Sequence, residues 1–490
     1  MRLRAIALLV CACLIAAPNV VAASPTPGLI HAVVTFHSGI PASFQDELEA
    51  RGVEGAMAFG SIRSVTLAAP IEVLEDLQAD PRVRQVRAQR RLEFLLYGSV
   101  EQIGAQGVES GEAYDFGGTT QTRPGVTGEG STVAVVDTGI WEGHPDLFGK
   151  VLDRLNFEYQ YAYPVFTPEQ RDIAFTATGP HAIADGWGHG THVAGIVAGT
   201  GMMAAGRENH GAAPGADLVS LKIGDLHNGF PQDAGWETNA IAALDWVLRH
   251  HDDERFGPNG IRIVNNSWTL MAEDLLFGVP QYDPLADLIR QMAAEGIINV
   301  FAAGNSGGAG VVPVPNGMHE VITVANACKA IDSCGAGNIA GDSSRGPSVD
   351  VAAPGTDIIS TYLPASLIGA LKPFFGGSYG STDEERAQNN AFYSGASGTS
   401  MAAPHVAGLV ALLLEVNPAL TPEQVRDILT TTADDAGPAG VDDAWGFGLV
   451  DTREALRLAH QMTLSAPTED PNKPCHPNKP EHDKKPCRPR

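Results

Sequence analysis

Short, wholly apolar segments alternate with longer amphipathic ones along the middle of the chain, and this alternation constrains the fold more than any other feature. The runs TVAVVD (132–137), IRIVNNS (261–267) and INVFAA (298–303) have the length and composition of buried strands. Helical patterns follow the first two runs, at AIAALDWVLRHHDD (240–253) and DPLADLIRQMAAEG (283–296). Buried strands joined by helices form parallel sheets, so the sequence predicts an α/β fold.

A smaller folding unit is predicted ahead of this region, within residues 30–94. Its segments HAVVTF, FQDELEARG, IRSVTLAA, PIEVLEDLQAD and VRQVRAQ follow the order strand, helix, strand, helix, strand. This order predicts a small open sheet with helices on one face. We assign residues 24–97 to a small α+β domain and residues 98–462 to the large α/β domain.

The first 23 residues have the features of a cleavable export signal. Arg2 and Arg4 precede an apolar run from Ala5 to Ala17, and the small residues Val21–Ala23 end the segment. The run is shorter than the roughly 20 apolar residues that a membrane-spanning helix needs. We therefore expect a secreted or cell-surface protein without a stable membrane span.

The charge balance restricts the partners. The 490-residue chain carries a formal net charge of −25 at pH 7. A strongly acidic protein is repelled by phosphate backbones and by anionic lipid, so nucleic acids and anionic membranes are not expected as partners.

Four of the six cysteines remain after the signal is removed, and they allow three disulfide pairings. The short spacing favours a local loop disulfide between Cys328 and Cys334. A zinc site is the alternative, but no second cysteine or histidine pair lies near enough in sequence to complete it.

The C-terminal segment 463–490 is predicted to be an extended tail. It contains NKPCHP, NKPEHD and KKPCRP in succession, a six-residue period in which the regular prolines favour a polyproline-like conformation. A spacer or surface anchor is the favoured role. The alternative is metal binding through His476 and His482, and the tail also holds Cys475 and Cys487.

Two polar residues stand where an open α/β sheet forms its sites. Asp137 ends the apolar run TVAVVD, so its carboxylate is expected at the carboxyl edge of the sheet; capping of the next turn is the alternative. His189 lies between two glycines at the start of a small-residue helix. His192 follows one turn later, but a zinc-protease helix would need a glutamate where Gly190 stands, which disfavours a two-histidine metal site.

Two more polar residues border glycine-rich turns. Ser400, in GTSMAAPHVAG, precedes the apolar run LVALLLEV, and a serine there could cap the helix. The same position would also place its oxygen where a helix N-terminus favours negative charge. Asn305 follows NVFAAG; it could adopt a turn conformation or supply an amide donor to a developing oxyanion.

Four segments together, VVDTGI, HGTHVAG, AAGN and GTSMAAPHVAG in that order, resemble the signatures of the subtilisin-like serine protease family over residues 101–461. The resemblance implies a mostly parallel sheet with helices on both faces. It implies an Asp137–His189–Ser400 triad that hydrolyses peptide bonds through an acyl-enzyme. It also implies an oxyanion site made by the Asn305 side chain and the Ser400 backbone N–H.

Residues 24–97 resemble the inhibitor-type propeptide of such proteases, and FLLYGSV (94–100) would then contain a self-cleavage point. The implied partners are protein or peptide substrates and the chain's own propeptide, and the enzyme is expected to be a monomer that needs no cofactor. Three alternatives stay open: an unrelated N-terminal domain that remains attached, a peptide acyl transferase that uses the same triad, and a non-proteolytic binding module.

Departures from the family pattern concern substrate and calcium. The substrate strand reads Ser267-Trp268-Thr269 where the family typically has Ser-Leu-Gly, so preferences in the pockets formed with Ala302, Ala303 and Gly304 are open. Calcium is a candidate ligand with Asp146 as its only assigned residue, because the partner loop GTGMMAAGRENHG lacks the expected asparagines. Segments 156–184 and 362–392 resemble insertions near the His189 and Ser400 loops.

Overall fold

The computed structural model describes residues 29–94, 112–157, 185–201, 210–224, 237–270, 282–363 and 392–465, with short gaps at 54, 90–91, 117–118, 312–313, 330–333 and 336, together with residues 103, 105, 108 and 111. The export signal, the segment 95–100, the tail beyond residue 465 and most of the two inserted segments lie outside the described residues. The predictions for them, including those for Cys475 and Cys487, remain predictions.

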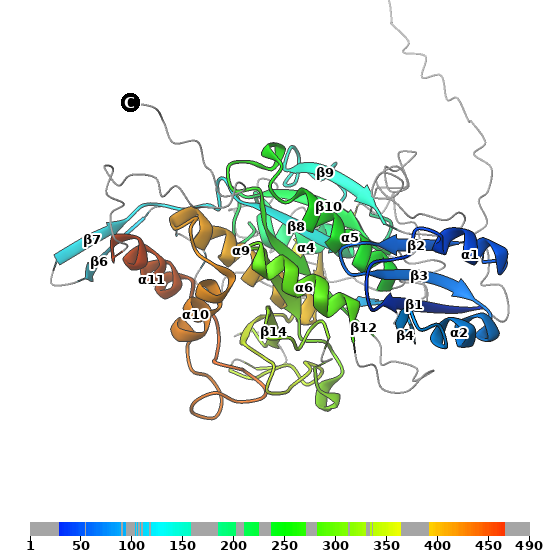
Figure 1. The fold of residues 1–490 in the computed structure, drawn as a ribbon. Helices are drawn as coiled ribbons and strands as arrows, with labels where there is room; N and C mark the ends of the chain where they lie inside the picture. The colour runs from blue at the N-terminus through cyan, green and yellow to red at the C-terminus, as the bar shows by residue number, and fades with distance from the viewer. Residues whose placement is uncertain are drawn as a thin grey trace, which may run out of the picture.

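A seven-stranded sheet forms the centre of the large domain (Figure 1). Its strands lie in the order β15-β14-β13-β11-β8-β10-β9, and every neighbouring pair is parallel, which confirms the predicted α/β fold. The strands are β8 (Thr132–Asp137), β9 (Val151–Asn156), β10 (Asp217–Lys222), β11 (Ile261–Asn266), β13 (Ile298–Ala302), β14 (Val321–Ala327) and β15 (Val351–Pro354).

Helices cover both faces of this sheet, as the interior strand β8 shows. All six of its residues are buried, and successive side chains point to opposite faces. Val133 and Val135 belong to one apolar cluster with the helices on their face, whereas Ala134 and Val136 belong to a second cluster with the helices on the other. The first face is covered by α4 (His189–Ala198) and α9 (Thr399–Val416), the second by α5 (Glu237–His250) and α6 (Pro284–Ala294).

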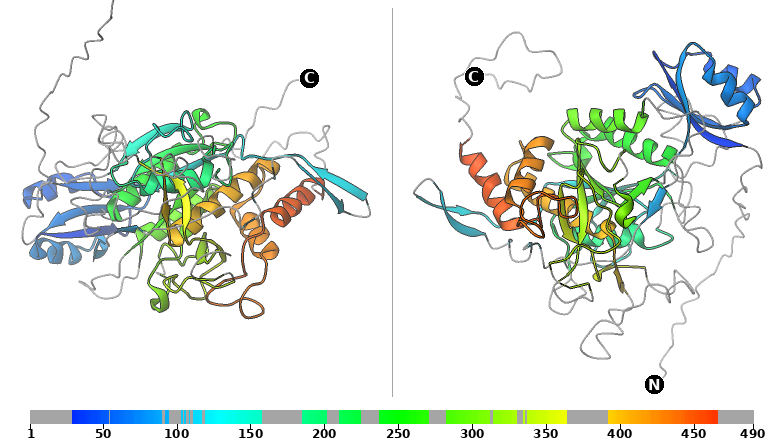
Figure 2. Two further views of the ribbon diagram at one scale, coloured as in Figure 1. Left: turned by 180° about the vertical axis from the view of Figure 1, so that it is seen from behind. Right: turned by 90° about the horizontal axis from the view of Figure 1, so that it is seen from below.

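Helix α9 crosses the core of the large domain. Among the described residues it is the one helix with the length and apolar composition of a membrane span, and 89% of it is buried inside the protein. It therefore packs as a core helix. Two further helices, α10 (Pro422–Thr432) and α11 (Thr452–Ser465), follow it, and a hairpin of β6 (Glu112–Phe116) and β7 (Thr119–Arg123) lies beside α11 (Figure 2).

The N-terminal unit is a four-stranded antiparallel sheet in the order β2-β3-β1-β4 with two helices. The sequence predicted three strands, and the structure adds β2 to them. The elements are β1 (Ile30–Phe36), α1 (Phe44–Ala50), β2 (Ala56–Phe59), β3 (Ser64–Ala69), α2 (Ile71–Gln78) and β4 (Val83–Ala88).

The N-terminal unit lies beside helix α5 of the large domain, and strand β2 explains this contact (Figures 1 and 2). Ala56 and Ala58 belong to the small domain's own core, whereas Met57 and Phe59 belong to the apolar cluster of helices α5 and α6. The chain then forms β5 (Leu92–Phe94), which pairs antiparallel with β12 (Trp268–Leu270) of the large domain.

The large domain also contains a separate pair of strands and a disulfide. Strands β16 (Ile358–Thr361) and β17 (Tyr393–Ala396) form an antiparallel pair, and β17 leads directly to helix α9. Cys328 and Cys334 form the predicted disulfide, with Cα atoms 5.7 Å apart, at the end of β14.

Candidate active site

Three of the predicted site residues stand at the ends of elements. Asp137 is the last residue of strand β8, His189 is the first residue of helix α4, and Asn305 follows strand β13 by three residues. Ser400 is the second residue of helix α9. The carboxyl ends of parallel strands meet at one edge of a sheet, and helices that follow them begin there, so the topology gathers these residues.

Asp137 and His189 form a buried, short hydrogen bond. Oδ1 of Asp137 lies 2.6 Å from Nδ1 of His189, and the two side chains are 1% and 0% exposed. A carboxylate oxygen only accepts, so the imidazole proton resides on Nδ1 and the lone pair on Nε2. Oδ1 also accepts from the backbone N–H of Thr138 at 2.7 Å, which fixes the carboxylate.

Asp185 orders the turn that leads into helix α4. Its Oδ1 accepts from the Thr138 hydroxyl at 2.9 Å and from the backbone N–H of Gly188 at 2.7 Å, while Oδ2 accepts from the backbone N–H and the hydroxyl of Thr191. Gly188, the N-cap, has φ 102° and no side chain to cap the helix, so Asp185 supplies the acceptor instead. Sequence analysis missed this residue; its signal was an aspartate ahead of Gly-x-Gly.

Trp187 covers the imidazole of His189. The two rings are stacked with centroids 5.2 Å apart and an interplanar angle of 16°. The backbone carbonyl of Trp187 accepts from the hydroxyl of Tyr362 at 2.9 Å. The stack limits the directions in which the imidazole can turn.

Ser400 forms a reciprocal pair with Ser267. The Ser400 hydroxyl donates to the Ser267 carbonyl at 2.6 Å, and the Ser267 hydroxyl donates to the Ser400 carbonyl at 2.7 Å. Pro404 explains the second bond. It lies inside helix α9 four residues after Ser400 and has no N–H, so the Ser400 carbonyl lacks its helical donor and takes the hydroxyl of Ser267.

The helix-capping interpretation of Ser400 is wrong, because Gly398 is the N-cap and the Ser400 oxygen points away from the first turn. Among the described residues, the Ser400 hydroxyl is bonded to Ser267 and not to His189. In enzymes without bound substrate, catalytic hydrogen bonds are often long or poorly aligned, and they tighten when the substrate binds.

The side chain of Asn305 is held by its oxygen. Oδ1 accepts from the backbone N–H of Thr399 at 3.1 Å and from the Thr399 hydroxyl at 3.0 Å. The amide nitrogen therefore faces away from Thr399 and makes no bond to the part of the chain that the structure describes. The arrangement leaves an N–H donor beside the N-terminus of the helix that carries Ser400.

The metal interpretation of His189 and His192 is not supported by the geometry. Nε2 of His192 faces two carbonyl oxygens, those of Ser394 at 3.0 Å and Ile358 at 3.2 Å. An atom that faces two acceptors carries a proton and cannot ligate a metal. Burial lowers the pKa of His192 to about 3, with the carbonyl contacts opposing this and the neighbouring histidines adding to it, so the ring is neutral at pH 7.

Comparison with known proteins decides the family. The subtilase family model matches residues 128–448. The chain is 33% identical to serine protease AprX of Bacillus subtilis over 321 residues, and 32% identical to fervidolysin of Fervidobacterium pennivorans over 348 residues. It is 30% identical to subtilisin DY of Bacillus licheniformis over 340 residues, which cover 68% of this chain and 93% of subtilisin DY. The chain belongs to the subtilase family.

The alignments with these relatives cover part of this subtilase and part of each relative. The alignments cover 63% of this chain and 62% of AprX, and 70% of this chain and 43% of fervidolysin. The crystal structure of fervidolysin, described as a keratinolytic enzyme related to subtilisin, superposes with a TM-score of 0.61 over 89% of this chain and 62% of that chain. At 23% identity this superposition shows a common fold.

The predicted substrate-binding residues of the subtilase lie side by side. Strand β12 contains Trp268 and Thr269, and the buried amide of Asn316 donates to the carbonyls of Trp268 at 3.0 Å and Ala302 at 2.8 Å. Asn316 therefore joins β12 to the segment of Ala302, Ala303 and Gly304. Sequence analysis missed it, because Asn316 is remote from both strands. The indole of Trp268 is fully buried, edge-on to Phe301.

Calcium binding at Asp146 stays a prediction. Asp146 is fully buried, and its Oδ2 accepts from the Tyr393 hydroxyl at 2.5 Å. Calcium takes six to eight oxygen ligands, and the described part of the chain has no group of three or more His, Cys, Asp or Glu side chains arranged for a metal. Most of the loop GTGMMAAGRENHG lies outside the described residues.

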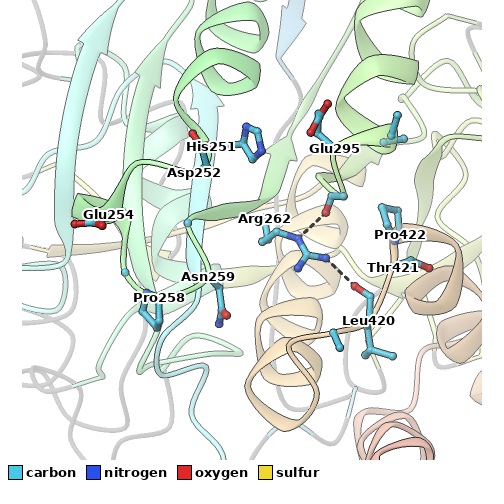
Figure 3. A pocket seen from close by; sticks show the side chains of 16 residues that line it. His251, Asp252, Glu254, Pro258, Asn259, Arg262, Glu295, Leu420, Thr421 and Pro422 are labelled. Carbon is cyan, nitrogen blue, oxygen red and sulfur yellow. Dashed lines mark hydrogen bonds between the residues drawn. The ribbon is translucent and has the colours of Figure 1, made fainter. Parts of the chain in front are cut away.

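A pocket of about 860 Å³ lies at the opposite edge of the sheet (Figure 3). Arg262 lines it and donates to the carbonyls of Gly296 at 2.6 Å and Leu420 at 2.7 Å. Arg262 stands near the start of β11, whereas Asp137 ends the neighbouring parallel strand. The pocket is therefore separated from Asp137 by the length of the strands.

Proposed function

We propose that this subtilase is an exported serine endopeptidase, made as a precursor that its own active site processes. The observation that carries the proposal is the buried 2.6 Å bond between Asp137 and His189 at the edge of the sheet where Ser400 begins helix α9. A carboxylate, an imidazole with its lone pair on Nε2, and a hydroxyl at a helix N-terminus are the groups that acyl transfer needs.

In the proposed mechanism the Ser400 hydroxyl leaves the Ser267 carbonyl, turns to Nε2 of His189 and attacks the substrate carbonyl. His189 takes the proton and returns it to the leaving amine, while Asp137 stabilises the imidazolium. Negative charge develops on the substrate oxygen, and the Asn305 amide and the Ser400 backbone N–H donate to it. Water then hydrolyses the acyl-enzyme, and His189 again acts as the base.

The substrate backbone is proposed to pair with strand β12. In this chain Phe94, Glu93 and Leu92 of β5 pair with Trp268, Thr269 and Leu270. An extended peptide that adds a strand to an open edge is bound through its backbone, so the replacement of the family's Leu-Gly by Trp268-Thr269 leaves the pairing intact. The N-terminal segment thus lies as a peptide substrate would.

The contacts of the N-terminal unit support its role as a propeptide. Arg87 forms two 2.6 Å hydrogen bonds to the carboxylate of Glu237, and the two side chains are 5% and 0% exposed. Gln85 donates to the Tyr282 carbonyl at 2.7 Å and accepts from its N–H at 3.2 Å. Asp137, His189 and Ser400 are buried in the full-length chain, as a precursor held inactive would require.

The deciding experiment is Ser400→Ala in the full-length chain with export intact. The variant lacks the nucleophile, so it should accumulate as a species that begins near Ser24, whereas the wild type should begin between residues 95 and 105. N-terminal sequencing measures the boundary. The matured wild type should also generate new N-termini in unfolded casein, detected by mass spectrometry. Maturation of the variant to the same N-terminus in a protease-deficient host would contradict self-processing.

A further inference from the structure

Strand β17 ends four residues ahead of Ser400, and its first residue is tied to the segment that follows the acid of the triad. The Tyr393 hydroxyl donates to Oδ2 of Asp146 at 2.5 Å, and the two residues are 4% and 0% exposed. Asp146 lies nine residues after Asp137 in the chain. A short bond from a hydroxyl to a carboxylate, shielded from water, is among the stronger hydrogen bonds in proteins.

The backbone on either side of Tyr393 is held in the same way. Nε2 of His144 donates to the Phe392 carbonyl at 2.8 Å, and Nδ1 of the same ring accepts from the Asp146 N–H at 3.1 Å. Nε2 of His192 donates to the Ser394 carbonyl at 3.0 Å. Each of the three successive residues 392–394 is therefore hydrogen-bonded to a different side chain.

These side chains come from the two segments that carry the other members of the triad. His144 and Asp146 follow strand β8 and its terminal Asp137, while His192 lies one turn after His189 in helix α4. After Tyr393 come the last three residues of β17, then Ser397 and Gly398, and then helix α9, which begins at Thr399. The position of the nucleophile is thus coupled to that of the acid and the base.

We infer that Tyr393 is a positioning residue for catalysis, whose hydroxyl binds Asp146 and thereby holds the strand that presents Ser400. The inference rests on the proposed function, since it concerns the attack by Ser400. Among the side chains that form these hydrogen bonds, Tyr393 can be tested by removing a single oxygen atom, in Tyr393→Phe.

The test is a pre-steady-state burst with an activated peptide ester, for which hydrolysis of the acyl-enzyme is slower than its formation. The burst amplitude counts competent sites, and the burst rate measures acylation of each site. Tyr393→Phe should keep the wild-type amplitude and lower the burst rate by about 10- to 100-fold, since small displacements of a reacting group cost that much. Tyr114→Phe is the control: it removes a hydroxyl of strand β6 that is hydrogen-bonded to Nδ1 of His460 in helix α11 at 2.7 Å, and both quantities should stay unchanged.

Asp146→Asn changes the acceptor of the same hydrogen bond. The asparagine keeps an oxygen that can accept from the Tyr393 hydroxyl. The variant's burst rate should fall less than that of Tyr393→Phe, because a neutral acceptor binds the hydroxyl more weakly. An unchanged rate in Asp146→Asn would overturn the inference even if Tyr393→Phe does not fold. Both variants are measured with EDTA and with calcium, and their ratios to wild type should be the same in both.

Three other outcomes would also overturn the inference. A lower amplitude with a wild-type rate in Tyr393→Phe would mean that the hydroxyl only stabilises the fold. A deficit in Asp146→Asn that appears only with calcium would mean that Asp146 acts through a bound cation. A wild-type enzyme without any burst would refute the proposed function itself, and that failure is distinguishable because it precedes any comparison of variants.

Discussion

The local structure around Ser400 depends on a hydrogen bond that cannot form in the helix and on one that forms in its place. Pro404 cannot donate to the Ser400 carbonyl, and this makes that oxygen available to the Ser267 hydroxyl. The reciprocal bond then brings the Ser400 hydroxyl to the Ser267 carbonyl. The start of strand β12 and the start of helix α9 are thereby joined side by side.

Ser267→Ala should destabilise the protein by about 1–3 kcal/mol, because it leaves the buried Ser400 carbonyl without a donor. The loss should be smaller in a Pro404→Ala background, where residue 404 supplies the helical N–H. The apparent unfolding temperature at a fixed scan rate measures the effect, in the Ser400→Ala precursor so that autolysis is absent. Strictly additive effects, within about 0.5 kcal/mol, would refute this account of Pro404.

Helix α4 contains a buried histidine, His192, that makes the stability of the protein depend on pH. All ten of its residues are buried, and the neutral ring of His192 is enclosed with His189 and His405 as its ionisable neighbours. The pKa of His192 is about 3 when folded, against about 6.5 when unfolded. Between these values the unfolded chain binds a proton that the folded chain does not, so acid favours unfolding.

The contribution of His192 should therefore be fully present above about pH 6.5 and decline below it, by about 1.4 kcal/mol per pH unit down to about pH 3. His192→Gln keeps a donor for the Ser394 carbonyl and removes the titration. The free energy of unfolding, or the unfolding temperature at fixed scan rate, should depend less steeply on pH in this variant than in wild type. Equal slopes between pH 4 and 6 would show that His192 does not titrate as described.

The same elements show what the sequence could and could not predict. Strands such as β8 were predictable because burial on both faces demands an unbroken apolar run. Strand β2 was missed because it has four residues, two of them alanine, and its larger side chains face another domain. Asn316 and Tyr393 were missed for a related reason. Each acts on a partner from a distant segment, and no local pattern records which one.

At the scale of the whole molecule, the N-terminal unit rests on the large domain through an apolar patch and a few buried polar links. Met57, Phe59 and Ile62 supply the apolar part, and the Arg87–Glu237 pair is the most enclosed of the polar links. Removing one partner of a buried ion pair leaves an uncompensated charge, which typically costs about 3–5 kcal/mol. An exposed pair contributes about 0–1 kcal/mol.

Glu237→Gln should therefore weaken the binding of the N-terminal unit to the large domain by about 10- to 10³-fold, because Asp283, 3.5 Å from Arg87, still compensates part of its charge. After the proposed self-cleavage the unit should separate sooner, so the lag before full peptide hydrolysis should shorten and less of the unit should co-elute in gel filtration. Adding Arg87→Met should restore part of the lag, because an apolar side chain can fill the site without a buried charge. Asp76→Asn, in an exposed pair of the same unit in which Asp76 is 75% exposed, should leave the lag as in wild type. If Glu237→Gln and Asp76→Asn mature with the same lag, the buried pair does not govern release, and the apolar face of β2 must hold the unit in place.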